Sequence, residues 1–129
     1  MATTPPEYRP GVCNIGGSER RHRYRLAAAA YLVALVYAAV VLVSDTPTFL
    51  LVGLVVPLSL GTEWLLQARR AFCAGLALSG RFSFDGQRGT VPDDAQPSDR
   101  RYGFRLFLVG LGVGAVATAV VYAGATLVA

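Results

Sequence analysis

Glu63 is the single acidic residue within the long apolar stretches of this 129-residue chain, which makes it the first candidate for chemistry. A carboxylate buried in lipid is costly, so such a residue is by default a proton or ion site. However, Glu63 lies six residues before Arg69, about 9 Å along a helix, which is close to the end of its apolar stretch. Gln67 and Arg70 follow on the same helix face and could hold the carboxylate by hydrogen bonds. We therefore expect an interfacial structural role for Glu63, with a proton or ion site as the alternative.

Cys13, Cys73 and His22 are the only thiols and the only imidazole. A structural zinc site needs four ligands, and iron–sulfur clusters generally need four cysteines. One chain offers three soft ligands, at spacings that match no zinc-finger or ferredoxin pattern. Two copies could bring four cysteines together. We expect no cofactor and reduced thiols, with Cys73 packed inside the protein, and keep a metal or redox site at these three residues as the alternative.

All twelve basic residues are arginines, and none lies between Arg25 and Arg69 or after Arg105. The cluster before the first gap consists of Arg20, Arg21, Arg23 and Arg25. Such a cluster could bind anionic lipid headgroups, at about 1 kcal/mol per arginine, although it is more simply interpreted as a determinant of topology. Nucleic-acid binding is not expected, because the cluster is short, adjoins an apolar run and contains one aromatic residue.

Three apolar runs coincide with the gaps between arginines: residues 26–43, 48–68 and 106–129. Eighteen helical residues extend about 27 Å, close to the thickness of the hydrocarbon layer. A buried helix in a soluble protein is rarely this apolar for more than about fourteen residues. The runs predict an all-α membrane protein with three transmembrane helices, the second kinked by Pro57.

The positions of the arginines predict the orientation, because basic residues favour the cytoplasmic side. Residues 1–25 form a cytoplasmic arm, 44–47 an external turn, and 69–105 a cytoplasmic segment, with the C-terminus outside. This predicts a multi-pass protein of the cell membrane. A cleaved signal peptide fits less well, because its apolar core usually spans seven to fifteen residues.

The segment 69–105 has its own local signals. The second helix is expected to continue beyond Arg70 and to stop at Gly80. The dipeptide Asp85-Gly86 between alternating residues predicts a small β-hairpin, which would need support from the membrane or a partner. Residues 1–10 are expected to be disordered.

Small residues recur on one face of each apolar run. The clearest set lies in the third run, where Gly110 and Gly114 form a GxxxG pattern and seven-residue spacing relates Gly103, Gly110, Ala117 and Gly124. Shorter sets are Ala30, Ala34 and Ala38 in the first run and Gly53 and Gly61 in the second. Small faces let helices approach closely in lipid. Because three helices enclose little interior, a homo-oligomer or another membrane protein is the expected partner.

Two segments together resemble a family of small membrane proteins from high-GC prokaryotes of the actinobacterial and haloarchaeal type. The first is Cys13-Asn14-Ile15-Gly16, and the second is Gln67-Ala68-Arg69-Arg70-Ala71-Phe72-Cys73, followed by Gly80-Arg81-Phe82-Ser83-Phe84. The family pattern is CNIG near the N-terminus and QARxxFC after a span. The resemblance covers about a third of the chain and implies a membrane protein, with no catalytic or binding residue to carry over.

No enzyme motif is present: the chain has no P-loop, dinucleotide-binding glycine pattern, HExxH or serine-elbow sequence. We therefore expect a non-enzymatic accessory or scaffold subunit that acts through helix packing and its cytoplasmic face. The alternatives are a redox or metal-binding protein that uses Cys13 and Cys73, and a proton or ion pathway that uses Glu63.

Overall fold

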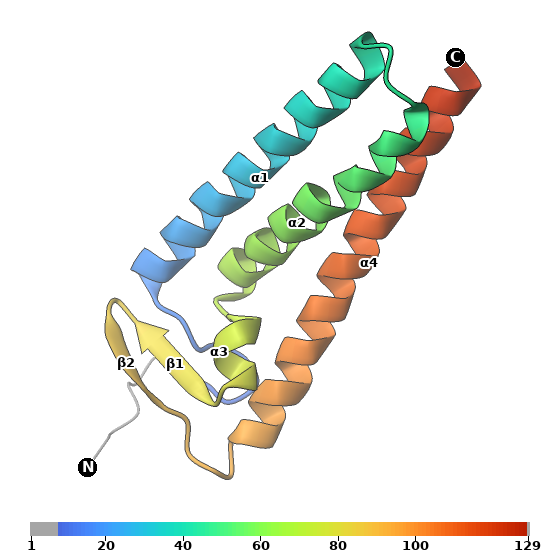
Figure 1. Cartoon of the computed structure of the whole chain (residues 1–129). Helices are drawn as coiled ribbons and strands as arrows, with labels where there is room; N and C mark the ends of the chain where they lie inside the picture. The colour runs from blue at the N-terminus through green and yellow to red at the C-terminus, as the bar shows by residue number, and fades with distance from the viewer. Residues whose placement is uncertain (1–7, 129) are drawn as a thin grey trace.

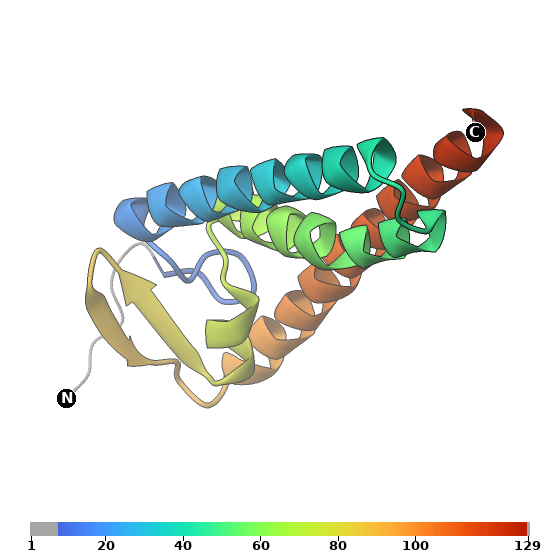
Figure 2. The ribbon, with the colours of Figure 1, turned by 45° about the horizontal axis from the view of Figure 1, so that its top comes forward.

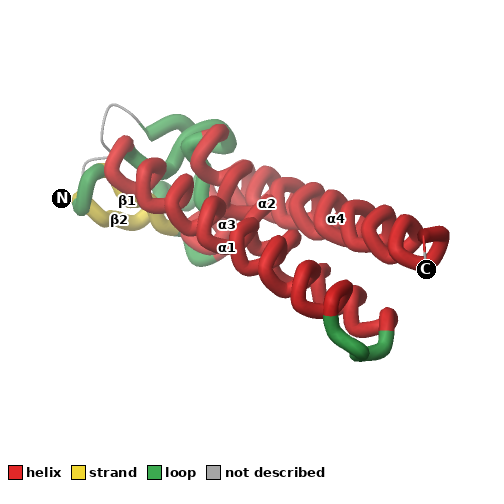
Figure 3. The backbone as a smooth tube through the Cα atoms, turned by 90° about the horizontal axis from the view of Figure 1, so that it is seen from above, coloured by secondary structure: helices red, strands yellow, loops and turns green. Residues whose placement is uncertain are grey.

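Three long helices carry a small module of strands and turns at one end (Figure 1). The computed structural model describes residues 8–128. Its elements in chain order are α1 (Gly17–Val43), the 3-10 helix η1 (Thr48–Leu54), α2 (Val55–Arg70), α3 (Ala74–Leu78), β1 (Arg81–Phe84), β2 (Gln87–Thr90) and α4 (Gln96–Val128). The strands and most of the loops gather at the end opposite the C-terminus, while the turn between α1 and η1 lies at the other end (Figure 3).

Three helical segments are long and apolar enough to cross a membrane: Gly17–Val43, Thr48–Arg70 and Gln96–Val128. They confirm the prediction of a mostly helical fold with three candidate spans. Helix α2 packs against both α1 and α4 (Figure 2). Large apolar side chains such as Leu35 and Val116 remain 68% and 65% exposed, which is typical of helix surfaces that face lipid.

Helices α1 and α4 extend well beyond the apolar runs. Helix α1 begins at Gly17 rather than Leu26, and its 27 residues extend about 40 Å. Helix α4 begins at Gln96 rather than Leu106, inside the expected loop, and its 33 residues extend about 50 Å. Both extensions lie on the side of the module, where all twelve arginines are found. We call this side the arginine-rich end: residues 8–25, 69–105 and the elements they form.

The second span changes helix type along its length. It begins as the 3-10 helix η1 and becomes α-helical at Val55, so Pro57 lies in the first turn of α2. A proline in a first turn removes no intrahelical hydrogen bond, since the N–H groups there have no partner within the helix. The change of helix type occurs at Val55, two residues before Pro57, where a kink was predicted.

Helix α2 does not continue to Gly80 as predicted. It ends at Arg70, because Ala71 adopts the left-handed conformation (φ 54°, ψ 41°) and the N–H of Phe72 turns back to the carbonyl of Gln67 at 3.0 Å. A separate five-residue helix, α3, follows. Gly80 does mark a stop, with φ of 72° just beyond the end of α3.

The predicted hairpin is confirmed. Strands β1 and β2 are antiparallel, with Phe82 opposite Gly89, and positive φ angles at Asp85 and Gly86 fit a two-residue turn. The hairpin packs against other segments of the same chain. Ile15 bridges to Ser83 in parallel, which adds a strand-like edge.

A small apolar core lies under the hairpin. It contains Tyr8, Phe82, Phe84, Val91 and Ala95, with Cys13 packed against it. Tyr8 falls in the segment that was expected to be disordered, so that expectation fails at this residue, while residues 1–7 lie outside the described part. The ring of Tyr8 is buried in the same apolar core as Phe82 and Phe84, and this packing holds the residue against the hairpin.

Candidate functional site at the arginine-rich end

Asn14 joins the N-terminal segment to the end of α2 and to β1. Its side chain is fully buried: Nδ2 donates to the carbonyl of Cys73 at 3.1 Å, and Oδ1 accepts from the N–H of Cys73 at 2.6 Å. Its main-chain N–H donates to the carbonyl of Ala71 at 3.0 Å, and its carbonyl accepts from the N–H of Ser83 at 2.9 Å. One residue thus satisfies the polar groups left open where α2 ends. Segments 13–16, 67–73 and 80–84, distant in sequence, meet here.

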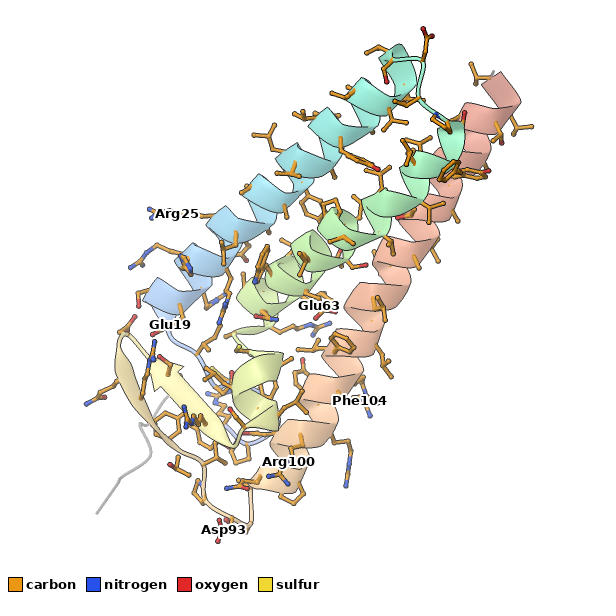
Figure 4. All side chains as sticks on the ribbon, viewed as in Figure 1. Glu19, Arg25, Glu63, Asp93, Arg100 and Phe104 are labelled. Atoms are coloured by element: carbon orange, nitrogen blue, oxygen red, sulfur yellow. The ribbon has the colours of Figure 1, made fainter. Side chains whose placement is uncertain are left out.

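Glu19 caps α1 and holds the hairpin turn. Its carboxylate accepts hydrogen bonds from the N–H groups of Gly16 (3.2 Å), Asp85 (2.8 Å) and Gly86 (3.0 Å) and from the hydroxyl of Ser83 (2.8 Å). Burial raises the pKa of Glu19, but these hydrogen bonds outweigh it and lower the pKa to about 2. The carboxylate at the foot of α1 is therefore ionised and structural (Figure 4).

Asp99 ties the N-terminal segment to the start of α4. The hydroxyl of Tyr8 donates to Oδ2 at 2.7 Å, and the N–H of Gly11 donates to Oδ1 at 2.6 Å. Asp99 is fully buried, so both contacts are shielded from water. Burial, followed by the hydrogen bond to Asp99, raises the pKa of Tyr8. The beginning of the described chain is thereby fixed to its last helix.

The candidate metal ligands lie in different surroundings. Cys73 is buried, and its Sγ accepts a hydrogen bond from Nη2 of Arg23 at 3.2 Å. Cys13 directs its Sγ to the carbonyl of Ile15 at 3.7 Å. His22 is exposed on α1. Within residues 8–128, no group of three or more His, Cys, Asp or Glu side chains could hold a metal ion.

The arginine cluster of α1 divides into two inward and two outward side chains. Nε of Arg20 donates to the carbonyl of Ala68 at 2.8 Å, and Arg23 reaches Cys73. Arg21 and Arg25 are exposed. Half of the cluster therefore fastens α1 to the segment at the end of α2, and half is exposed on the surface.

A polar cavity of about 440 Å³ opens between the first turns of α1, α3 and the hairpin. Its lining consists of Ser18, Glu19, His22, Arg23, Leu76, Ser83 and Arg88. Nε of Arg23 is buried and has no hydrogen-bond partner. The lining thus brings two arginine side chains together with the carboxylate of Glu19.

Glu63 occupies a different place, between α2 and α4. A methyl group added at Gly110 would overlap its carboxylate, so the glycine makes room for this side chain. One carboxylate oxygen is buried without a hydrogen-bond partner, as is Oε1 of Gln67. Neither Gln67 nor Arg70 donates to this buried oxygen in the described part of the chain, and the side chain of Arg70 is exposed.

The glycine pattern of α4 faces α2 and α3 within the same chain. A methyl group added at Gly114 would overlap Oγ of Ser59, and one at Gly103 would lie 3.0 Å from Cβ of Ala77. Ala117 is half-buried. Gly124 is exposed, and an added methyl group would meet nothing within 4 Å, so this position is not part of the close helix contact. The GxxxG face is therefore occupied by the chain's own helix.

The glycines of the second span receive tyrosine rings from α1. A methyl group added at Gly61 or Gly53 would lie 2.9 Å and 2.8 Å from atoms of Tyr31 and Tyr37, respectively. The hydroxyl of Tyr31 is hydrogen-bonded to Thr62 at 2.9 Å. These two rings lie between α1 and the second span and fill the space left by the glycines.

Comparison with protein-family models, curated proteins and solved structures finds no match to this chain. The function must therefore be inferred from the geometry.

Four residues that organise this end were not singled out from the sequence: Asn14 as a hydrogen-bonding residue, Glu19, Arg88 and Asp99. Only Glu19 had a local signal, because it follows Gly16 at the three-residue spacing of a capping box. Asn14 and Asp99 bond to residues 59 and 91 positions away, so no local pattern reveals them.

Proposed function

We propose that this chain is a non-enzymatic, multi-pass subunit of the cell membrane that presents a rigid platform to another membrane protein or a second copy. We define the platform as residues 8–16 and 71–95 of the arginine-rich end. The observation that supports it is the use of the buried polar groups. Asn14, Glu19 and Asp99 are saturated by hydrogen bonds that hold the platform together, which leaves a fixed surface rather than a reactive centre.

Exposed apolar side chains on the platform support a protein partner. Val12 is 53% exposed and Leu78 is 50% exposed, although neither belongs to a candidate span. Apolar side chains outside the lipid-facing helices are typical of contact surfaces. Helix α2 covers Gly110 and Gly114, so a homo-oligomer in this proposal forms through other faces of the chain.

The platform function is tested by photo-crosslinking in the native membrane. A crosslinking side chain at Leu78 should give a discrete protein adduct, whereas one at Val43, 86% exposed near the opposite end of α1, should not. The adduct should disappear when Asn14→Ala loosens the platform. Equal adducts from both positions, or an adduct that Asn14→Ala leaves unchanged, would contradict the proposal.

The proposed orientation places the arginine-rich end in the cytoplasm, in accord with the positive-inside rule. Cys73 is too buried to report on sides, so exposed positions are needed. In a background without native cysteines, a membrane-impermeant maleimide should label Asp45→Cys in intact cells. It should label Gln87→Cys only after permeabilisation; the reverse pattern would refute the orientation.

A proton or ion pathway through Glu63 is the second candidate, because one of its buried carboxylate oxygens has no hydrogen-bond partner. Proteoliposome flux that Glu63→Gln abolishes would favour this function, and unchanged flux would exclude it. A redox role for Cys13 and Cys73 gains less support, because each thiol has its own separate contacts.

A further inference from the structure

The polar cavity beside α1 lies where the headgroups of a bilayer would lie. The apolar run begins at Leu26, so Arg23 and Ser18 are about 4.5 Å and 12 Å below it along the helix. The headgroup layer extends roughly 5–8 Å beyond the hydrocarbon on each side. The upper half of the cavity is therefore at headgroup depth, and its lower half reaches into water.

The side chains of the cavity suit an anion with several oxygens. Arg23 and Arg88 line it from α1 and from β2, whereas the hydroxyl groups of Ser18 and Ser83 donate to the carboxylate of Glu19 at 3.3 and 2.8 Å. Nε of Arg23 lacks an acceptor, although Nη2 of the same group already donates to Cys73. Two arginine side chains in one cavity favour a phosphate, which accepts through several oxygens at once.

Glu19 does not neutralise this site. Its carboxylate is directed to the N–H groups of Gly16, Asp85 and Gly86 and to the hydroxyl of Ser83, so its charge is compensated by those donors. With His22 neutral, two arginines against one carboxylate leave a net formal charge of +1 in the lining.

We infer that this cavity is a binding site for the phosphate group of an anionic ligand, held by Arg23 and Arg88 with His22 as an additional partner. A lipid headgroup would enter from the bilayer, and a soluble phosphate would enter from the aqueous side. The site is distinct from the outward-facing Arg21 and Arg25, and it does not depend on the platform having a protein partner.

The test uses the full chain in a neutral maltoside detergent. Binding of dioctanoyl phosphatidic acid and of inorganic phosphate is measured by isothermal titration calorimetry. We expect saturable binding at one site per chain. Tighter binding of the lipid supports the site with the bilayer as the source, and equal binding of inorganic phosphate supports it with a soluble source. Absence of saturable binding of either probe would overturn the inference.

Matched variants separate the cavity from general surface charge. Arg88 is exposed on the hairpin, so Arg88→Gln should fold normally and weaken binding about fivefold. Arg81→Gln removes the same charge from the same hairpin outside the cavity and should leave binding within twofold. Arg23→Gln should weaken binding further, with helix content checked by circular dichroism. Equal losses from Arg81→Gln and Arg88→Gln, or no loss from Arg88→Gln, would overturn the inference.

Discussion

Replacing Asn14 by alanine should open the arginine-rich end around Cys73. The side chain of Asn14 makes two hydrogen bonds to the main chain of Cys73, at 2.6 and 3.1 Å, and it is fully buried. Its loss leaves a buried N–H and a buried carbonyl without partners, at about 1–3 kcal/mol for each group. Taking the lower value for both, the free energy of local opening should fall by about 2 kcal/mol, or about 30-fold in the opening equilibrium.

The thiol of Cys73 reports this opening directly, because it is buried against the same contact. The assay is the rate of alkylation by N-ethylmaleimide in detergent, in a Cys13→Ser background. Asn14→Ala should raise the rate about 30-fold relative to the parent. Gln87→Ala, which removes an exposed amide from the hairpin, should leave the rate unchanged.

Asn14→Asp sharpens the test. Aspartate keeps the size and the acceptor for the N–H of Cys73, but it replaces the donor Nδ2 by an oxygen that faces the carbonyl of Cys73. Labelling should be at least as fast as in Asn14→Ala, because a buried carboxylate then faces an acceptor. If either variant reacts within twofold of the parent rate, the inferred role of Asn14 is wrong.

Three further predictions concern the cap and the helix contacts. Because folding lowers the pKa of Glu19 from 4.5 to about 2, the contribution of Glu19 to the stability of the fold should be complete above pH 4.5 and be lost as the pH falls toward 2. Thermal unfolding followed by circular dichroism should show this loss, and Glu19→Gln should abolish the pH dependence. Gly114→Ala should lower stability by about 1–3 kcal/mol in the same assay, because the methyl group would lie 2.7 Å from the backbone N and Cα of Ser59. Gly112→Ala, with open space around it, should be neutral, and equal effects would refute the packing described here. Tyr31→Phe should cost about 0.6 kcal/mol through the lost hydrogen bond to Thr62, and an unchanged melting temperature would indicate that this bond contributes nothing.

The local elements followed from local patterns. Three apolar runs predicted the three candidate spans, since the length of an apolar helix is fixed by the layer it must cross. The Asp85-Gly86 turn and the stop at Gly80 depend on backbone conformations that few residue types adopt, so their positions were also readable. The prediction for the end of α2 was wrong: the helix was expected to continue beyond Arg70, but it ends there.

The reason for that failure is tertiary. Ala71 has no intrinsic preference for the left-handed conformation, and the residues beside it are not of the types that usually end a helix. The structure supplies Asn14, from 57 residues earlier in the chain, to bind the polar groups that the turn exposes. An ending that depends on a distant side chain cannot be read from the residues at the ending itself.

The same distinction applies to function. The sequence by itself determined that the chain has three apolar spans and that its twelve arginines lie outside them, because composition and spacing are sufficient for both. It also presented GxxxG, the arginine cluster and Glu63 as candidates without saying what each would touch. Only the tertiary structure decided that α2 fills the glycine face, that two of the four clustered arginines turn inward, and that Arg23 and Arg88 meet across a cavity. These outcomes depend on which helix faces and strands approach one another, and packing, rather than local sequence, sets that approach.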